Sequence, residues 1–125
     1  MHEPNQLCEI LTPDFIFTDT RGTICQLVHD GYQQVNLVYT NKGSKRGSFH
    51  YHKINEELFF VIYGKIEVCL RAQDLEEKHV FGKGDMFQIH KNVQHDFCFL
   101  EDTLLLGLYD HGVELPDNSK DIYNA

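Results

Sequence analysis

Residues 50–64 carry the clearest structural signal in this chain, and they read His50-Tyr51-His52-Lys53-Ile54-Asn55-Glu56-Glu57-Leu58-Phe59-Phe60-Val61-Ile62-Tyr63-Gly64. Successive side chains of a β-strand point to opposite faces of the sheet. His50 and His52 therefore share one face, and Tyr51 lies on the other. Two glutamates follow, and an apolar run then ends at Gly64. We expect two strands here, with a pair of imidazoles on one face of the first.

A third histidine belongs to a later apolar run. Gly84-Asp85 opens a second pair of strands, and His95 then shares its face with Phe97 and Phe99. Elsewhere, short runs rich in β-branched and aromatic residues alternate with turn residues, a pattern typical of an antiparallel sandwich or barrel. The predicted strands cover residues 15–17, 23–28, 34–39, 48–52, 58–63, 65–70, 86–89, 95–100 and 104–109.

Two segments lack a strand signal. Residues 71–79 are strongly charged, and we expect them to form a loop at the end of a hairpin. Residues 114–125 are polar and form a short C-terminal tail, which either becomes a helix or packs against the barrel edge. With 125 residues and 42% hydrophobic content, the chain suits one all-β domain spanning residues 1–125.

Charge and composition narrow the classes of partner. The formal net charge of −8 argues against general binding to nucleic acid or to an anionic membrane surface. The first residues lack the basic and apolar regions of a signal peptide, and no apolar run is long enough to span a membrane. We therefore expect a cytoplasmic protein with neither nucleic acid nor membrane as its partner.

The four cysteines form no C-x-x-C pair, and three of them lie in apolar strand-like runs. We expect Cys8, Cys25, Cys69 and Cys98 to be buried structural thiols. Among the remaining histidines, we expect His2, His79 and His111 to be solvated. His29 and His90 are left open, because either could line a barrel mouth.

The order of the residues resembles the two-motif pattern of the cupin superfamily, which implies a single jelly-roll (double-stranded β-helix) barrel. In cupins, two histidines, a carboxylate and a later histidine converge inside the barrel and commonly bind a divalent metal. The resemblance implies Fe, Mn, Ni or Zn as the ion. The implied ligands are His50, His52, Glu57 and His95. The second motif is degenerate, since His90, Asn92 and Phe99 replace its usual Pro, Gly and Asn.

Two further elements narrow the resemblance. Residues 19–22 read Asp19-Thr20-Arg21-Gly22, and residues 45–53 read Lys45-Arg46-Gly47-Ser48-Phe49-His50-Tyr51-His52-Lys53. Together they resemble the D-x-R-G and R-G-x-F-H-x-H-K elements of the dTDP-4-keto-6-deoxyhexose 3,4-ketoisomerases and, more distantly, those of the dTDP-4-dehydrorhamnose 3,5-epimerases. The similarity implies an enzyme of deoxysugar or surface-polysaccharide biosynthesis that requires no cofactor. It also implies a homodimer whose N-terminal strands are exchanged.

The same resemblance implies roles for individual residues. Arg21 and Arg46 would face the diphosphate or thymidine of a nucleotide sugar, which a guanidinium binds in a fork. His50 and His52 would move protons between neighbouring carbons through an enediol, since imidazole titrates near neutral pH. The remaining implied residues are Tyr51 as a catalytic group and Tyr39, His95 and Tyr109 as substrate-binding groups.

The proton-transfer and metal readings compete for the same atoms, because a histidine nitrogen bonded to a metal cannot accept a proton. The carboxylate of the isomerases aligns with Glu56, whereas Glu57 fits the cupin metal spacing. If His50 and His52 hold a metal, Tyr51, His90 or Glu56 would have to move the proton. A third reading is a sugar-binding cupin without catalysis.

Overall fold

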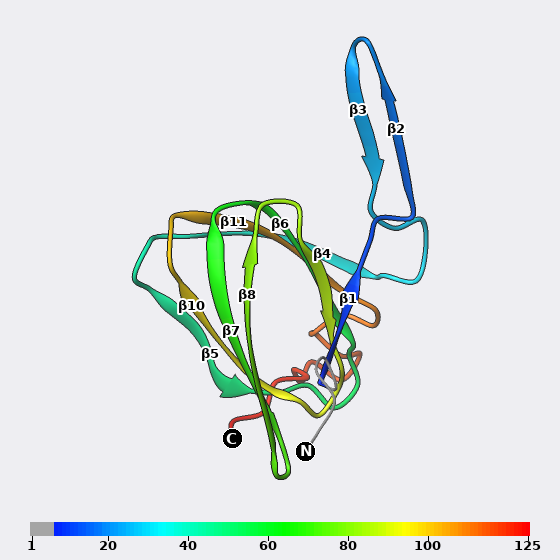
Figure 1. Cartoon of the computed structure of the whole chain (residues 1–125). Helices are drawn as coiled ribbons and strands as arrows, with labels where there is room; N and C mark the ends of the chain where they lie inside the picture. Colours follow the sequence, from blue (N-terminus) through cyan, green and yellow to red (C-terminus); the bar gives the residue numbers. More distant parts are fainter. Residues whose placement is uncertain (1–6) are drawn as a thin grey trace.

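The computed structural model describes residues 7–125, and its regular secondary structure within them consists of β-strands alone. No helix suited to crossing a membrane occurs among these residues. All paired strands are antiparallel, as predicted, and Figure 1 shows a barrel with one hairpin standing away from it. The strands are β1 (Cys8–Leu11), β2 (Phe15–Asp19), β3 (Gly22–Gln26), β4 (Gln34–Thr40), β5 (Lys45–His50), β6 (Glu57–Tyr63), β7 (Lys65–Ala72), β8 (Leu75–Gly82), β9 (Met86–Ile89), β10 (Gln94–Phe99) and β11 (Thr103–Tyr109).

Two sheets form the barrel walls. The five-stranded sheet has the order β1-β9-β6-β11-β4, and the four-stranded sheet has the order β5-β10-β7-β8. Each order mixes early and late strands, so neighbours in space come from distant parts of the chain. The inward residues of β7 and β10 alternate with outward ones, as in a sheet with one buried face. This alternation confirms the predicted all-β sandwich.

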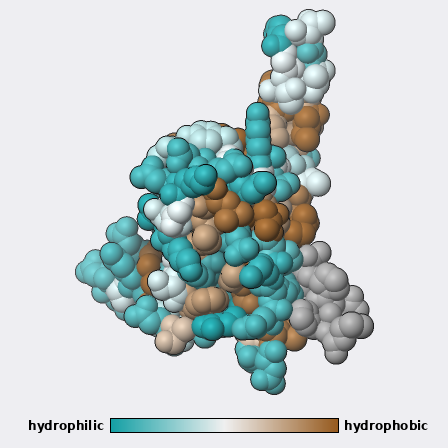
Figure 2. Space-filling model, turned by 60° about the vertical axis from the view of Figure 1, so that its left-hand side comes forward, coloured by the Kyte–Doolittle hydropathy of each residue, from teal (hydrophilic) through white to brown (hydrophobic). Residues whose placement is uncertain are grey.

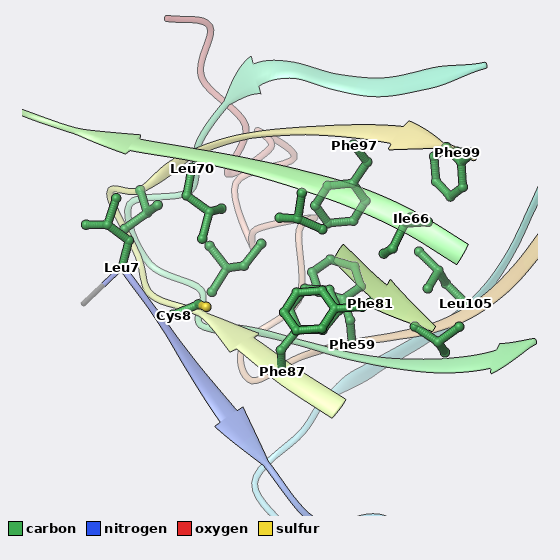
Figure 3. Close-up of a cluster of buried hydrophobic side chains, with 14 residues drawn as sticks. Leu7, Cys8, Phe59, Ile66, Leu70, Phe81, Phe87, Phe97, Phe99 and Leu105 are labelled. Carbon is green, nitrogen blue, oxygen red and sulfur yellow. The ribbon is translucent and has the colours of Figure 1, made fainter. Parts of the chain in front are cut away.

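Phenylalanine fills the space between the sheets (Figure 3). The rings of Phe81 and Phe87 stack at 4.0 Å, and Phe59 and Phe97 meet edge to face at 5.0 Å. Offset and edge-to-face pairs add to the hydrophobic gain of burying each ring, by about 0.5–1.5 kcal/mol per pair. The aromatic core occupies one part of the barrel and leaves another part for polar groups.

Two strands of the structure, β8 and β1, are not among those predicted from the sequence. The prediction of a loop over residues 71–79 is wrong, because β7 and β8 pair along their whole length as a hairpin. β8 is an edge strand whose inward residues Glu77, His79 and Phe81 alternate with solvent-facing ones. Two of those three are polar, so hydrophobicity alone concealed the alternation. β1 was missed because it is short and only its first residue is buried.

The cysteines differ from the prediction. Cys8 is buried, Cys69 and Cys98 are half-buried, and Cys25 is exposed, although all four are free thiols. Cys25 lies on β3 in the hairpin that stands away from the barrel, so no second sheet covers it. The prediction of burial is therefore wrong for Cys25. Burial in this chain follows from tertiary placement and not from the apolar character of the run.

The β2–β3 hairpin is apolar although it stands free. Phe15, Ile16, Phe17 and Ile24 are all exposed, and the tip carries Arg21. Figure 2 shows hydrophobic side chains along the lower part of the hairpin and hydrophilic ones at its end. Contiguous exposed apolar surface of this kind commonly marks an interface with another molecule.

Gly64, which the sequence pattern singled out, closes the tight turn from β6 to β7. Its φ is +104°, and a Cβ there would lie 2.3 Å from Thr103 Oγ1 and 2.6 Å from the Asp102 carbonyl oxygen. We expect Gly64→Ala to lower the free energy of unfolding by about 2–4 kcal/mol through strain and overlap. Urea denaturation measures it, with Gly84→Ala as a control whose added Cβ meets no atom within 4 Å. An equal loss in both variants would mean that φ alone, without the overlap, decides the cost.

Candidate active site

A cavity of about 180 Å³ opens between the two sheets beside the aromatic core. Its polar wall consists of Arg46, His50, Glu57, His95 and Tyr109. Its apolar wall consists of Val38, Phe59, Phe97, Phe99 and Leu105. A concave apolar site with a few convergent polar groups is the usual form of a small-molecule site.

Strand register brings the polar wall together. His95 on β10 pairs directly with His50 at the end of β5, and their rings lie 4.4 Å apart. Tyr109 at the end of β11 pairs directly with Glu57 at the start of β6. Two cross-strand pairs, one from each sheet, thus place four chemically active side chains at the same end of the barrel.

A bulge in β5 positions His50. His50 lies four positions after Arg46 in β5, whereas their partners His95 and Phe97 lie only two positions apart in β10. Gly47 has φ +108°, and a Cβ there would lie 2.7 Å from the His95 carbonyl oxygen, so only glycine permits this approach. Bulges often redirect side chains beside functional sites. Here the bulge lets both Arg46 and His50 line the cavity.

His52 is held between two acceptors. Its Nδ1 donates to the Asp121 backbone carbonyl at 2.6 Å, and its Nε2 donates to Glu57 Oε1 at 3.1 Å. A backbone carbonyl and an ionised carboxylate can only accept, so this setting favours the imidazole with two N–H groups and a positive charge. Burial alone would lower the pKa of His52, but the hydrogen bond and charge of Glu57 outweigh it and raise that pKa.

Glu57 is the ionised partner at the centre of the site. Burial alone would raise the pKa of Glu57, but the hydrogen bond from His52 lowers that pKa overall. The Tyr109 hydroxyl also donates to Glu57, and burial together with the Glu57 charge raises the pKa of Tyr109. Tyr109 therefore stays protonated and can act as a hydrogen-bond donor.

His50 has the opposite electrostatic setting. It is half-buried on the cavity wall, and burial lowers its pKa, as does the charge of His52. A neutral imidazole has one ring nitrogen without a proton, and this nitrogen can accept one. The site thus pairs a neutral imidazole at the cavity with a charged imidazole behind it, with ring centroids 5.2 Å apart.

His95 makes stability depend on pH. Burial lowers the pKa of His95 to about 4, below the value of about 6.5 expected in the unfolded chain. Unfolding therefore takes up one proton between about pH 4 and pH 6.5, and stability falls as the pH falls, by about 1.4 kcal/mol per pH unit. His95→Gln should remove this slope. Urea denaturation from pH 4 to 8 measures it, and parallel curves for variant and wild type would contradict the prediction.

Asp121 is a buried residue of the C-terminal tail that the sequence did not identify. Its carboxylate accepts hydrogen bonds from the backbone N–H groups of Lys53, Ile54 and Asn55 at 2.9–3.0 Å, and from Asn55 Nδ2 at 2.8 Å. These bonds fix the connection between His52 and Glu57. Of the two alternatives for residues 114–125, the tail packs against the barrel, with a bridge between Tyr51 and Tyr123. Only its polar composition marked the tail, so no signal in the sequence singled out Asp121.

Three predicted site residues lie away from the cavity. Tyr51 faces the other side of its strand and packs on Tyr123 at 5.6 Å between centroids. Tyr39 lies on the exposed face of β4 against Tyr63 at 6.5 Å. Arg21 is at the tip of the hairpin, bound to Asp19, with 84% of its side chain exposed. Tyr51 and Tyr39 lie away from the cavity because side chains alternate along a strand and these two lie on the outer face. Arg21 lies away from the cavity because its hairpin stands free of the barrel.

The structure also distinguishes which of the remaining glutamate and histidine candidates face the cavity. Glu56 turns outward and accepts from the Lys91 backbone at 2.7 Å, so Glu57 is the inward carboxylate. His90 lies 3.5 Å from Glu56, outside the cavity wall. His29 and His111 are exposed. His79 is wrongly predicted as solvated, since its side chain is only 16% exposed, and His2 lies outside the described residues.

The residues at this site also fit a divalent metal. Ligand atoms of His50, His52 and His95 all lie within 4.8 Å of one another, and Glu57 Oε1 lies 3.7 Å from His95 Nε2. Three imidazoles and a carboxylate form an established donor set for such ions. Because Nδ1 of His52 is bonded to the Asp121 carbonyl, only Nε2 of His52 is open to a metal.

Solved structures share this architecture. The sugar 3,4-ketoisomerase QdtA from Thermoanaerobacterium thermosaccharolyticum, in complex with TDP, aligns over 96% of this chain and 89% of its own, with 15% identity and a TM-score of 0.77. The TDP-quinovose 3,4-ketoisomerase WlaRB from Campylobacter jejuni aligns over 93% of both chains, with 21% identity and a TM-score of 0.77. The dTDP-4-dehydrorhamnose 3,5-epimerase from Sulfolobus tokodaii aligns over 94% and 77%, with 20% identity and a TM-score of 0.75.

At these identities the similarity establishes a shared fold. No curated protein sequence gives a significant match to this chain. The family model of the cupin domain matches residues 36–106, which include most of β4, all of β5 to β10, the start of β11 and both histidine-bearing segments. That match covers more than half of the 125 residues. Both the matched sequence and the two-sheet barrel therefore show that this chain belongs to the cupin domain family.

Proposed function

We propose that this protein is a nucleotide-sugar isomerase or epimerase acting on a dTDP-4-keto-6-deoxyhexose-type substrate. The observation that carries the proposal is the pairing of neutral His50 at the cavity with the charged His52–Glu57 pair behind it. The structural relatives named above are isomerases and epimerases of the same class of sugar, which supports the choice of substrate.

In the proposed reaction, His50 takes a proton from the carbon next to the ketone. The C–H electron pair forms the carbon–carbon double bond of an enediolate, and the carbonyl π electrons move onto oxygen. His50 then returns the proton to the former carbonyl carbon. The hydroxyl proton on the carbon that was deprotonated moves to the former carbonyl oxygen, so that the ketone changes position and no redox partner is needed. A neutral imidazole with a lowered pKa is suited to accept a proton near neutral pH.

The developing oxygen charge needs stabilisation in a site with little water. The positive charge of His52 lies behind His50, and the protonated Tyr109 hydroxyl lies on the cavity wall. A fixed positive charge stabilises an oxyanion strongly, because it needs no reorganisation during the reaction. We assign His52 to this role through its charge alone, since both of its N–H groups are bonded to Asp121 and Glu57. Tyr109 and His95 are assigned to the wall that orients the sugar.

Arg46 is the proposed contact for the diphosphate. It lines the cavity, and its Nε donates to Thr40 Oγ1 at 2.8 Å, which leaves the terminal guanidinium nitrogens for a ligand. A local guanidinium allows a chain of net charge −8 to hold an anionic ligand.

A nucleotide-sugar enzyme of this kind would act in the cytoplasm, without nucleic acid or membrane as partner.

Arg21 requires a second copy of the chain to take part. β4 is the edge strand of the five-stranded sheet, and Leu37 on its outer face is 67% exposed. The apolar β2–β3 hairpin matches this edge in character, and we propose that the hairpin of a partner copy covers it in a homodimer. The partner's hairpin tip would then bring its own arginine towards the cavity.

Mixed dimers test that arrangement. Arg21→Ala and His50→Asn chains, each inactive alone as a pure dimer, should recover activity when unfolded and refolded together. One site of the mixed dimer then holds an intact Arg21 and an intact His50 from different chains. Light scattering should give a dimer for both variants. Absence of recovery in mixed dimers would place Arg21 outside the partner's site.

The reaction itself is tested by incubating the protein with dTDP-4-keto-6-deoxyglucose in heavy water. Proton NMR should show an isomerised or epimerised sugar, with deuterium at the carbon that was protonated. Binding without exchange would support the sugar-binding reading instead. Neither product nor deuterium uptake with this and related keto-sugars would refute the proposed function.

A metal-dependent cupin is the second candidate function, and the convergence of three imidazoles favours it. His50, His52, His95 and Glu57 would hold the ion, which would supply Lewis-acid polarisation of a bound oxygen. Elemental analysis of the purified protein separates the two functions. A stoichiometric metal that His95→Gln removes would support the second, and full turnover after chelation would support the first.

A further inference from the structure

A second group of metal-binding side chains lies outside the cavity. Cys8 is on β1, and Glu77 and His79 are on β8, two residues apart and therefore on the same face. Cys8 Sγ lies 3.6 Å from His79 Nε2, which lies 3.0 Å from Glu77 Oε1. All three ligand atoms are within 4.8 Å of one another, and none of the three residues lines the cavity.

The cluster lies at a seam of the barrel. β1 is the outermost strand of the five-stranded sheet, and β8 is the outermost strand of the four-stranded sheet. β1 pairs only with β9 among the described strands, so these side chains provide contact between the sheets at this edge. Figure 3 shows Cys8 pointing into the space between the sheets beside Leu7 and Leu70.

The donors are held in place by their surroundings. The Leu7 backbone N–H donates to Glu77 Oε2 at 2.9 Å, which leaves Oε1 turned towards His79. The His79 ring stacks on Phe81 at 5.5 Å with an interplanar angle of 18°. Glu77 and Cys8 are buried, whereas part of the His79 side chain reaches solvent, so the site is enclosed but accessible on one side.

A nucleophilic role for this thiol is excluded by its setting. Cys8 has no exposed surface, so no substrate reaches its sulfur. Burial, with the nearby charge of Glu77, also raises the pKa of Cys8 to about 12, the opposite of what a reactive cysteine needs. The cluster is therefore of interest as a set of ligands.

The distances match tetrahedral coordination. Bonds of about 2.3 Å to sulfur and about 2.0 Å to nitrogen at tetrahedral angles place those two atoms about 3.5 Å apart. The sulfur–nitrogen distance here is 3.6 Å. The same calculation gives about 3.3 Å between nitrogen and oxygen, compared with 3.0 Å here. Small movements would thus admit an ion.

We propose that Cys8, Glu77 and His79 form a zinc-class metal site that joins β1 to β8. Cys8 Sγ, His79 Nε2 and Glu77 Oε1 are the ligands, and a water on the solvent side of His79 completes the tetrahedron. When the metal–sulfur bond forms, the thiol proton leaves to solvent, and the His79 proton moves from Nε2 to Nδ1. A thiolate and a carboxylate balance the two charges of the ion, so the buried site is neutral overall.

The site would fix the base of the projecting hairpin. β1 ends at Leu11, and β2 of the hairpin begins at Phe15, so the connection is short. Holding Cys8 to β8 therefore limits the movement of the whole N-terminal arm. The role assigned to the metal is structural, and it is independent of the reaction at the cavity that His50 and His95 line.

Cobalt titration tests the proposal, because only a thiolate ligand gives intense sulfur-to-cobalt charge-transfer absorption in the near ultraviolet. The 125-residue chain should develop this band with one equivalent bound at the thiolate site. Cys8→Ser should abolish the band and His79→Asn should weaken it. Cys69→Ser, a half-buried cysteine outside the cluster, and His95→Gln, in the cavity, should both retain it.

Zinc should also raise the melting temperature of the wild type by roughly 10 °C at a concentration 100 times its Kd, and the rise should be absent in Cys8→Ser. Should Cys8→Ser not fold, Glu77→Gln provides the same comparison while keeping the thiol. Two results would overturn the site: absence of the charge-transfer band in the wild type, or its persistence in Cys8→Ser. A zinc shift that disappears only in His95→Gln would assign the metal to the cavity instead.

Discussion

His50→Asn should lower the rate of deuterium incorporation into a dTDP-4-keto-6-deoxyhexose by about 100- to 10,000-fold, the usual contribution of general acid–base catalysis. Asparagine keeps hydrogen-bonding capacity but cannot accept a proton from carbon. His50 lines the cavity, and its pKa is lowered, so it is the imidazole ready to act as a base. Proton NMR in heavy water measures exchange, and far-ultraviolet circular dichroism confirms that the variant is folded.

His52→Asn and His111→Asn are the matched comparisons. His111 is exposed and bonded to Asp110, so its replacement should leave the exchange rate within about twofold. His52→Asn removes the charge behind the base, and it should slow turnover while leaving some exchange. If His52→Asn abolished exchange and His50→Asn did not, the base would be His52 and the assignment made here would be wrong.

Asp121→Ala should be the most destabilising single change, with a loss of about 4 kcal/mol or more in the free energy of unfolding. Its carboxylate is fully buried and accepts four hydrogen bonds, three from backbone N–H groups. Each donor left without a partner in the interior costs about 1–3 kcal/mol, and all four lose theirs together. Urea denaturation at pH 7 measures the loss.

Asp117→Ala provides the control for Asp121. Asp117 belongs to the same tail and accepts bonds from Ser119, but it is exposed, so its loss should cost no more than about 1 kcal/mol. In Asp121→Asn, one oxygen remains as an acceptor, and the cost should fall between the two. Equal stability of Asp121→Ala and Asp117→Ala would show that the tail does not hold the 53–55 connection.

Acid should also weaken the hydrogen bonds that the Asp121 carboxylate accepts from residues 53–55. Burial alone would raise the pKa of Asp121, but its hydrogen bonds from Asn55 and the backbone lower that pKa overall. A carboxyl group with a lowered folded-state pKa contributes stability above its ordinary pKa, and this is lost as the pH falls through the folded value. Part of the acid sensitivity of the wild type should therefore be absent in Asp121→Asn, in the same denaturation series.

Much of the fold could be predicted from local patterns. All nine predicted strands lie at β2–β7 and β9–β11 of the structure, because alternation and turn residues are properties of neighbouring positions. The missed strand β8 is an edge strand with Glu77 and His79 on its inward face, and this polar face conceals the period of two. Burial of a polar residue depends on a partner elsewhere in the chain, which no local pattern reports.

The candidate site also has features that local sequence patterns predict and features that only tertiary contacts decide. His50, Glu57, His95, Arg46 and Tyr109 were predicted as site residues and all line the cavity. Tyr51 and Tyr39 face away from it, because each lies on the outer side of its strand. Contacts with β10 decide the bulge over residues 47–49. Contacts with the 53–55 connection decide how the C-terminal tail packs. Both lie far along the chain from the groups they touch.

The 50–64 stretch by itself determined that His50 and His52 share one face, since alternation fixes which side chains point the same way. The convergence of Glu57 with these imidazoles was implied by the resemblance to cupins. Only the tertiary structure decided their protonation. His52 is charged because Glu57 and the Asp121 carbonyl both accept from it, and His50 is neutral because it is half-buried beside that charge. Electrostatic fields depend on distances between groups in space, and those distances are set by register and packing.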